Sequence, residues 1–307
     1  MSSTTVGAPQ QGTAQAGAAR AKGGRRKAAS ADQGGWRKWL AYFGIALIII
    51  YCLLPFYWMV VSALRRPADV FETDVIPTPP SFQSFVDAFD PKNSFTRALG
   101  NSIFVAATVT ILTLVIGTFA AYALARLDFR LKNLSLAIII ATSMFPGIAM
   151  VIPLFKLFTN INWINTYQAL IIPAMSFALP LAVWNLTAFF RQMPAELEQA
   201  AMVDGCTQAQ AFRKVIMPLA APGVFTTAII VFVAAWNEYI IALTMTNKSD
   251  YRTATVAVTF FTGTTGRDIP FGSIMAAGVI LTVPLLIMVL LFQRRIVAGL
   301  TAGGVKS

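Results

Sequence analysis

Six long apolar stretches limit what this chain of 307 residues can fold into. They cover roughly residues 39–64, 99–124, 134–158, 169–190, 224–245 and 271–292. About 20 helical residues are needed to cross the hydrocarbon core of a bilayer, and each stretch is long enough. Because 56 % of the residues are hydrophobic and 12 % are charged, we predict an all-α membrane protein with six transmembrane helices.

Two polar segments frame the predicted membrane domain. Residues 1–35 are rich in Ala, Gly, Gln and Ser and carry five basic residues against one acid, which is typical of a disordered basic tail. Residues 36–307 then form one six-helix domain. Within it, a polar loop between predicted spans four and five covers residues 191–222, and a basic tail covers residues 294–307.

The placement of positive charge predicts the orientation of the chain in the membrane. With the N-terminus inside, about two-thirds of the 24 Lys and Arg residues fall on the inner side. Both termini and the 191–222 loop are therefore expected in the cytoplasm. The net charge of +11 is explained by this topology, so we expect no nucleic-acid partner.

Several classes of function lack their usual residues. The sequence has no histidine, which excludes His-dependent general-base catalysis and His-ligated metal sites. Its two cysteines, Cys52 and Cys206, make no plausible disulfide framework. No Gly-rich phosphate loop followed by Lys and Ser or Thr is present. We expect no catalytic site, no metal site and no cofactor bound by this chain.

Prolines interrupt several of the predicted spans. Pro146 and Pro153 fall in the third, Pro173 and Pro180 in the fourth, and Pro284 in the sixth. Each removes a backbone donor and bends a helix. These bends either let helices rock around a transport path or are simply tolerated, as proline often is in membrane helices.

The loop from Pro194 to Gly223 predicts two short helices joined by a sharp turn. Pro194 and the acids Glu196 and Glu198 favour a helix N-terminus. Gly205 is placed to end that helix in a left-handed conformation. The second helix starts with a Thr-x-x-Gln capping box. That box is formed by Thr207 and Gln210, and Pro218 is expected to end this helix.

The predicted helices each carry a stripe that suits a protein partner. Small alanines let another surface approach the backbone, and Phe212 offers a large side chain for a partner's pocket. A helix lying on lipid headgroups is the alternative, but it normally has a Lys/Arg-rich face, whereas the first helix is acidic. We therefore favour protein docking. The stripes comprise Leu197, Ala200, Ala201 and Asp204, then Ala209, Phe212 and Ile216.

The same residues resemble the EAA loop of ABC importer permeases. The spacing of Ala200, Ala201, Asp204 and Gly205, and of a later apolar residue before Pro218, is matched throughout. Gln199 stands where that family usually has Glu, and Cys206 stands where it commonly has Ala. The stretches AAYALARLDF, SMFPGIAMVIPLF and RRIVAGLTAGGVKS are also similar to the smaller permease subunit of maltose-type sugar importers, above all the actinobacterial trehalose and maltose systems.

The resemblance implies a fold, a function and partners. The fold is the ABC type I importer permease fold, and the chain forms half of a pore for a neutral di- or oligosaccharide. It pairs with a sister permease, with a cytoplasmic ATPase dimer that holds ATP and Mg, and with an extracytoplasmic substrate-binding protein or lipoprotein. It lies in the bacterial plasma membrane among its lipids. The residues implied in ATPase coupling are Gln199, Ala200, Ala201, Asp204, Gly205, Phe212, Ile216 and Pro218.

Substrate contacts are less constrained by the sequence. A neutral sugar needs amides, hydroxyls and aromatic faces, and a few such residues lie at suitable depth. They can equally serve contacts between helices. Candidates are Met144, Phe145, Ser176, Trp236, Asn237, Glu238 and Tyr239.

Other functions stay open at this point. An importer of another solute, such as glycerol 3-phosphate, would share the same motifs. An ion-coupled carrier needs a titratable group at membrane depth, for which Glu238 qualifies, although a carboxylate at the wet mouth of a cavity explains it better. A membrane enzyme would need a nucleophile and base or a metal set, and neither is found.

Overall fold

The structure is a computed structural model that describes residues 34–263 and 269–304. The chain divides into two compact units at Leu53 and Leu54, inside the first helix. The predicted tail 1–35 lies almost wholly outside the described residues. In the first unit, the described part is helical and its apolar side chains are exposed, as suits lipid surroundings.

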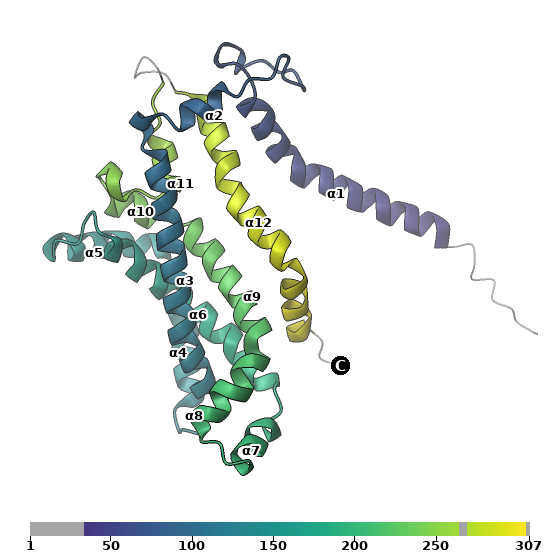
Figure 1. Ribbon diagram of the computed structural model, residues 1–307, viewed down its shortest axis with the longest axis vertical. Coiled ribbons are helices and arrows are strands. Elements are labelled where there is room, and N and C mark those ends of the chain that lie inside the picture. The colour runs from purple at the N-terminus through teal and green to yellow at the C-terminus, as the bar shows by residue number, and fades with distance from the viewer. Residues whose placement is uncertain (1–33, 264–268, 305–307) are drawn as a thin grey trace, which may run out of the picture. The chain divides into compact units, whose positions relative to one another are not determined.

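The described residues are mostly helical, and none of them forms a strand (Figure 1). Four 3-10 turns, η1, η2, η4 and η5, cover Pro67–Asp69, Pro91–Asn93, Ser249–Tyr251 and Val258–Phe260, and η3 (Phe212–Ile216) is a π-helical turn. The α-helices are α1 (Gly34–Ala63), α2 (Gln83–Ala88), α3 (Phe95–Arg126), α4 (Lys132–Ser143), α5 (Gly147–Asn160), α6 (Tyr167–Gln192), α7 (Glu196–Val203), α8 (Gln208–Ala211), α9 (Met217–Trp236), α10 (Ile240–Met245), α11 (Ala254–Ala257) and α12 (Phe271–Gly304).

The predicted all-α membrane fold is confirmed, with one change in the third span. Five helices of the described chain are long and apolar enough to cross a membrane. The third predicted span is a pair, α4 and α5, bent by 87°, and it makes a sixth crossing only if both count as one. The helix is interrupted at residues 144–146 because Pro146 disfavours a helical conformation at Phe145. Pro146 also lacks the N–H that would donate to the preceding turn.

The fifth span differs from its prediction at both ends. Pro218 was expected to end a loop helix, but helix continues from Gln208 to Trp236. The π-turn explains this, since Met217 N–H donates to Phe212 O and the wider turn accommodates the proline ring that follows. At its other end, α9 stops at Trp236 and α10 restarts at Ile240, so the predicted helix 224–245 is two helices.

Helices α3, α6 and α9 pack together as the centre of the second unit. Small residues let them approach closely, which suits helices that gain little from apolar burial in lipid. A side chain at Gly117 of α3 would lie 3.5 Å from Ala182 of α6. At Gly223 of α9, a Cβ atom would lie 2.5 Å from the ring of Phe189.

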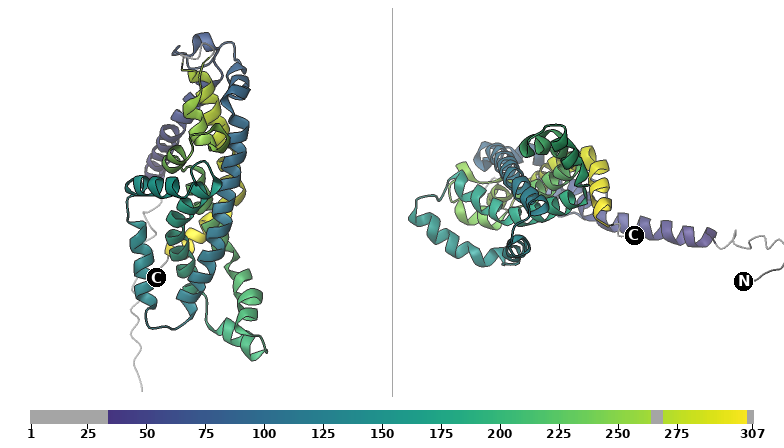
Figure 2. Two further views of the ribbon diagram at one scale, coloured as in Figure 1. Left: turned by 90° about the vertical axis from the view of Figure 1, so that its left-hand side faces the viewer. Right: turned by 90° about the horizontal axis from the view of Figure 1, so that it is seen from below.

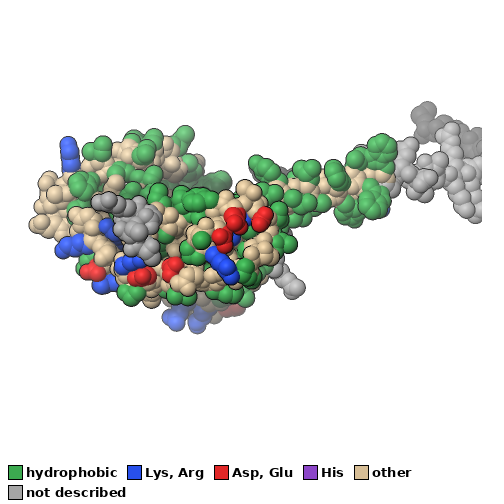
Figure 3. Space-filling model, turned by 90° about the horizontal axis from the view of Figure 1, so that it is seen from above, with side chains coloured by type: hydrophobic (Ala, Val, Ile, Leu, Met, Phe, Trp, Pro, Cys, Tyr) green, Lys and Arg blue, Asp and Glu red, His purple; other side chains and the backbone are tan. Residues whose placement is uncertain are grey.

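The two ends of α3 carry different structures (Figures 1 and 2). The α7–α8 hairpin lies at the end where α3 terminates, and α2 and α11 lie at the end where it begins. Acidic and basic side chains lie close together on the α2 end (Figure 3). They include the pairs Lys92–Asp90 at 3.4 Å and Arg97–Asp250 at 2.7 Å.

Candidate functional site

The turn between α7 and α8 has the conformation predicted from the sequence. Gly205 has a φ of 88°, a left-handed value that side-chain-bearing residues resist. Its N–H donates to Met202 O at 3.1 Å, and Cys206 N–H donates to Ala201 O at 3.0 Å. These bonds satisfy carbonyls that α7 would otherwise leave free, so the glycine terminates the helix.

The capping box that starts α8 is also confirmed. Gln210 N–H donates to the Thr207 hydroxyl at 3.3 Å, and the Gln210 side chain accepts from Thr207 N–H at 2.8 Å. Two otherwise unpaired donors are satisfied in this way. The hairpin therefore has a defined shape without a partner chain.

The residues predicted for docking divide between an outward and an inward face. Gln199, Ala200 and Asp204 are exposed, while Ala201 is buried and Ile216 is fully buried. Val203, next to the turn, is 87 % exposed although it is apolar. The hairpin thus presents Gln199, Ala200 and the turn to its surroundings.

Phe212 lies differently from the prediction. It was expected to offer its side chain to a partner's pocket, but its ring packs inside the chain and is half-buried. Its centroid is 4.5 Å from that of Tyr122 and 5.8 Å from that of Phe119, both on α3. These ring contacts attach the hairpin to α3, and the half-buried side chain keeps part of its surface exposed.

Glu198 forms a buried contact that the sequence reasoning did not find. One carboxylate oxygen accepts a hydrogen bond from the Tyr122 hydroxyl, and the other lies 3.6 Å from Arg126 Nε. The Arg126 guanidinium also donates to Met193 O at 3.0 Å. The Glu198 and Arg126 side chains are only 8 % and 11 % exposed. The sequence shows an acid next to Gln199. It does not show which way the Glu198 side chain points or that its partner lies on α3.

Two of the predicted substrate-path residues line one cavity. Phe145 and Ser176 border a mostly apolar cavity of ≈ 330 Å³ between the α4–α5 break and α6. The Ser176 hydroxyl donates to Ile172 O within its own helix at 2.9 Å, which leaves its lone pairs as acceptors. Met144, at 80 % exposure, is not among the residues that line this cavity.

The other candidates lie at the break between α9 and α10. Trp236 is buried and stacks on Phe232 at 5.8 Å, and Tyr239 packs against the main core. The Asn237 amide donates to Val233 O at 2.9 Å. Glu238 alone of the four borders a second cavity, of ≈ 130 Å³, which shares Phe177 with the first.

The Glu238 carboxylate caps a helix. Its two oxygens accept from the backbone N–H groups of Ile241 and Ala242 at 2.8 and 2.9 Å. These are first-turn donors of α10, which have no partner inside the helix. Glu238 therefore borders a cavity and also holds the first turn of the restarted helix.

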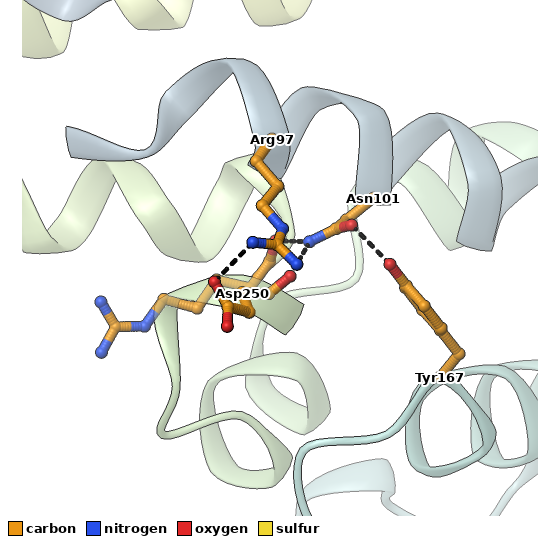
Figure 4. Close-up of polar contacts among 5 residues, drawn as sticks. Arg97, Asn101, Tyr167 and Asp250 are labelled. Carbon is orange, nitrogen blue, oxygen red and sulfur yellow. Dashed lines mark hydrogen bonds and ion pairs between the residues drawn. The ribbon is translucent and has the colours of Figure 1, made fainter. Parts of the chain in front are cut away.

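A second polar cluster, not predicted from the sequence, lies at the other end of α3 (Figure 4). The Asn101 side chain is buried and donates to Asp250 O and Arg252 O at 2.8 and 2.9 Å. Its oxygen accepts from the Tyr167 hydroxyl at 2.8 Å. Both amide hydrogens and the oxygen are therefore paired, and three separate chain segments meet at one residue.

Neighbouring contacts hold the same segment. Ser102 Oγ accepts from Ala254 N–H at 2.8 Å, and Asn165 Oδ1 accepts from the N–H groups of Asn247 and Lys248. The Arg252 guanidinium lies 3.7 Å from the centroid of the Phe260 ring, and burial lowers its pKa. Residues 247–254 are thus attached to α3 and to the loop that precedes α6.

Apolar helices around α3, α6 and α9, with a capped polar hairpin at one end, define a multi-pass membrane protein of the transport-permease class. The chain belongs to the family described as "Binding-protein-dependent transport system inner membrane component", whose pattern it matches over residues 92–301.

Relatives in this family are permease proteins of sugar transport systems. The chain is 45 % identical to the trehalose transport system permease protein SugB of Mycobacterium tuberculosis, over 85 % of this chain and 94 % of the relative. It is 41 % identical to the trehalose/maltose transport system permease protein MalG of Thermococcus litoralis, over 87 % and 96 %. A chain from the crystal structure of a bacterial ABC transporter that imports alginate shares the fold, with a TM-score of 0.72 at 20 % identity over 84 % and 96 %.

Proposed function

We propose that this chain is one of two permease subunits of an ATP-driven importer for a neutral di- or oligosaccharide such as trehalose or maltose. It lies in the bacterial plasma membrane with both termini in the cytoplasm. A cytoplasmic ATPase dimer, which binds ATP and Mg, docks on residues 194–218, and a substrate-binding protein delivers the sugar on the other side. The chain itself carries out no hydrolysis.

The α7–α8 hairpin is the observation that carries this proposal. It has a preformed turn at Gly205, an exposed face with Gln199 and Ala200, and a buried attachment to α3. A preformed surface binds a partner without first losing conformational entropy. Relatives that cover nearly the whole chain carry trehalose and maltose in their names, which supports the sugar class.

The geometry of Glu238 favours this function over an ion-coupled carrier. A carrier of that kind needs a carboxylate that can bind and release a cation. Both Glu238 oxygens accept backbone hydrogen bonds, so releasing them would free the first turn of α10.

Reconstitution in proteoliposomes tests the proposal. The chain is assembled with its sister permease, the ATPase and the binding protein, and ATP hydrolysis is measured with trehalose, maltose or glycerol 3-phosphate. Stimulation by a disaccharide is expected, while stimulation by glycerol 3-phosphate alone would assign the other solute class. Transport by the chain without an ATPase would contradict the ATP-driven mechanism.

Gly205→Val tests the docking hairpin in the same assay. A β-branched residue resists the left-handed conformation at φ 88°, so sugar-stimulated hydrolysis should fall about tenfold or more. Gly100→Ala is the control, because its added Cβ meets nothing within 4 Å. Undiminished stimulation in Gly205→Val would refute docking through this turn.

A further inference from the structure

Helix α3 has a property that the other membrane-crossing helices lack. Among the five long apolar helices of the described chain, α1, α6, α9 and α12 each contain proline, whereas α3 contains none. Proline interrupts the hydrogen-bond ladder and is the commonest cause of a kink. The 32 residues of α3 make one uninterrupted helix about 48 Å long.

One end of α3 is tied to the hairpin by buried charge. Glu198 of α7 contacts Arg126 and Tyr122, which lie one turn apart near the end of α3. Removing one partner of a buried pair leaves the other charge uncompensated, so the contact resists separation. The ring of Phe212 against Tyr122 reinforces it. We call these contacts the hairpin tie.

The other end of α3 is tied to residues 250–254. Asn101 donates to two backbone carbonyls of this segment, and Ser102 accepts from its Ala254 N–H. Tyr167 orients Asn101 by donating to its side-chain oxygen. Asn101 and Ser102 are both buried, so no water competes freely for these bonds. We call these contacts the segment tie.

The two ties lie on the same rigid element. We propose that α3 acts as a strut that carries a displacement of the α7–α8 hairpin to residues 250–254 at the opposite end, with Glu198 and Asn101 as positioning residues. The proposal rests on the function proposed above, since it assumes that an ATPase moves the hairpin. A stiff helix fixed at both ends moves as one body, whereas a hairpin on a kinked helix would lose part of its displacement in the bend.

Stability alone does not account for the Glu198–Arg126 pair of the hairpin tie. A buried ion pair is weak evidence for stability, because apolar residues of similar volume are often as stable or more so. The Glu198 pair lies on a hairpin with an exposed outer face. Its position suits fixing the direction of the hairpin relative to α3.

A double-mutant cycle across the length of α3 tests the strut. The readout is the number of sugar molecules transported per ATP hydrolysed by the assembled complex in proteoliposomes, so a lower yield of complex does not alter it. Glu198→Gln removes the charge pair from the hairpin tie, and Asn101→Leu removes the two carbonyl hydrogen bonds from the segment tie. Each should lower the ratio about fivefold.

The double variant decides the question. If both ties act through one strut, breaking the second adds nothing, and the loss stays about fivefold. Sites this far apart without shared partners normally act independently, which would give about 25-fold. A multiplied loss overturns the proposal, as does an unchanged ratio in either single variant.

A second double-mutant cycle uses smaller changes, in case the first variants fail to assemble. Tyr122→Phe and Tyr167→Phe each remove one hydroxyl while keeping their ring contacts with Phe212 and Phe104. Losses of about twofold that do not multiply support the strut, and multiplied or absent losses refute it. Asp128→Asn is the control, because its pair with Lys132 is exposed and lies outside both ties.

The wild-type complex and the variants test different hypotheses: the wild type tests the proposed function, and the variants test the strut. If the wild-type complex shows no sugar-stimulated hydrolysis, the proposed function is wrong and the strut falls with it. If the wild-type complex is coupled and the variants keep its transport ratio, only the strut is wrong.

Discussion

At the residue scale, neighbouring positions on α7 have opposite roles. Glu198 points inward to Arg126, and Gln199 is exposed on the other face. An acid one position away from the usual Glu therefore does not replace it at the outer surface. The family's Glu position is occupied here by a neutral amide, and the acid beside it joins the hairpin to α3.

Glu198→Gln should destabilise the chain by about 3 kcal/mol, because Arg126 keeps its charge in a site that is largely closed to water. Thermal denaturation of the purified complex measures the effect. Asp128→Asn removes an acid from an exposed pair and should change stability by less than about 0.5 kcal/mol. Equal effects of the two changes would show that the buried pair contributes no more to stability than the exposed pair.

Gly205→Ala and Gly100→Ala form a matched pair of substitutions. Neither added Cβ meets an atom within 4 Å, so the two differ in backbone conformation alone. Gly205→Ala should cost about 1 kcal/mol, since alanine resists a positive φ. Gly100→Ala lies in a helix and should stabilise by up to about 1 kcal/mol. Denaturation midpoints measure both, and a stabilising Gly205→Ala would contradict the left-handed turn.

At the element scale, helices α3, α6 and α9 are held together by close contacts between their surfaces. Small residues such as Gly117 and Gly223 lie where α6 meets α3 and α9. Van der Waals contact is the main driving force between helices in lipid, so the distance between their axes matters more than the area that they bury.

Gly223→Ala tests the contact between α9 and α6. The new Cβ would lie 2.5 Å from the base of the Phe189 ring, so the ring must rotate away or α6 and α9 must move apart. A loss of about 1–3 kcal/mol is expected from this overpacking. Thermal stability of the variant in detergent measures it, and Gly100→Ala again serves as the control. No loss of stability would mean that the two helices approach less closely than described.

At the scale of the whole molecule, the hairpin and α2 lie at opposite ends of the second unit. The proposed orientation places the hairpin in the cytoplasm and α2 on the outer side. The charge distribution of the sequence supports this proposed orientation.

Labelling with a membrane-impermeant thiol reagent tests the orientation. Cys52 and Cys206 are first replaced by serine, and single cysteines are introduced at Val203 or Val86, which are 87 % and 64 % exposed. In intact cells, Val86→Cys should react and Val203→Cys should react only after the membrane is opened. The reverse pattern would invert the topology.

The sequence by itself determined the parts of this protein that depend on local chemistry. Hydrophobic length predicted the membrane-crossing helices, and Gly205 with Thr207 and Gln210 predicted the shape of the hairpin. These features depend on residues near each other in the chain, where backbone preferences and capping bonds act directly.

Only the tertiary structure decided which side chains meet across the chain. Glu198 finds Arg126 72 positions earlier in the chain, and Asn101 finds the carbonyl of Asp250 149 positions away. It also packed the Phe212 ring against Phe119 and Tyr122 of α3. Periodicity describes the faces of one helix, but the rotation of each helix against its neighbours is set by packing among all of them, and that decided where α3 is held.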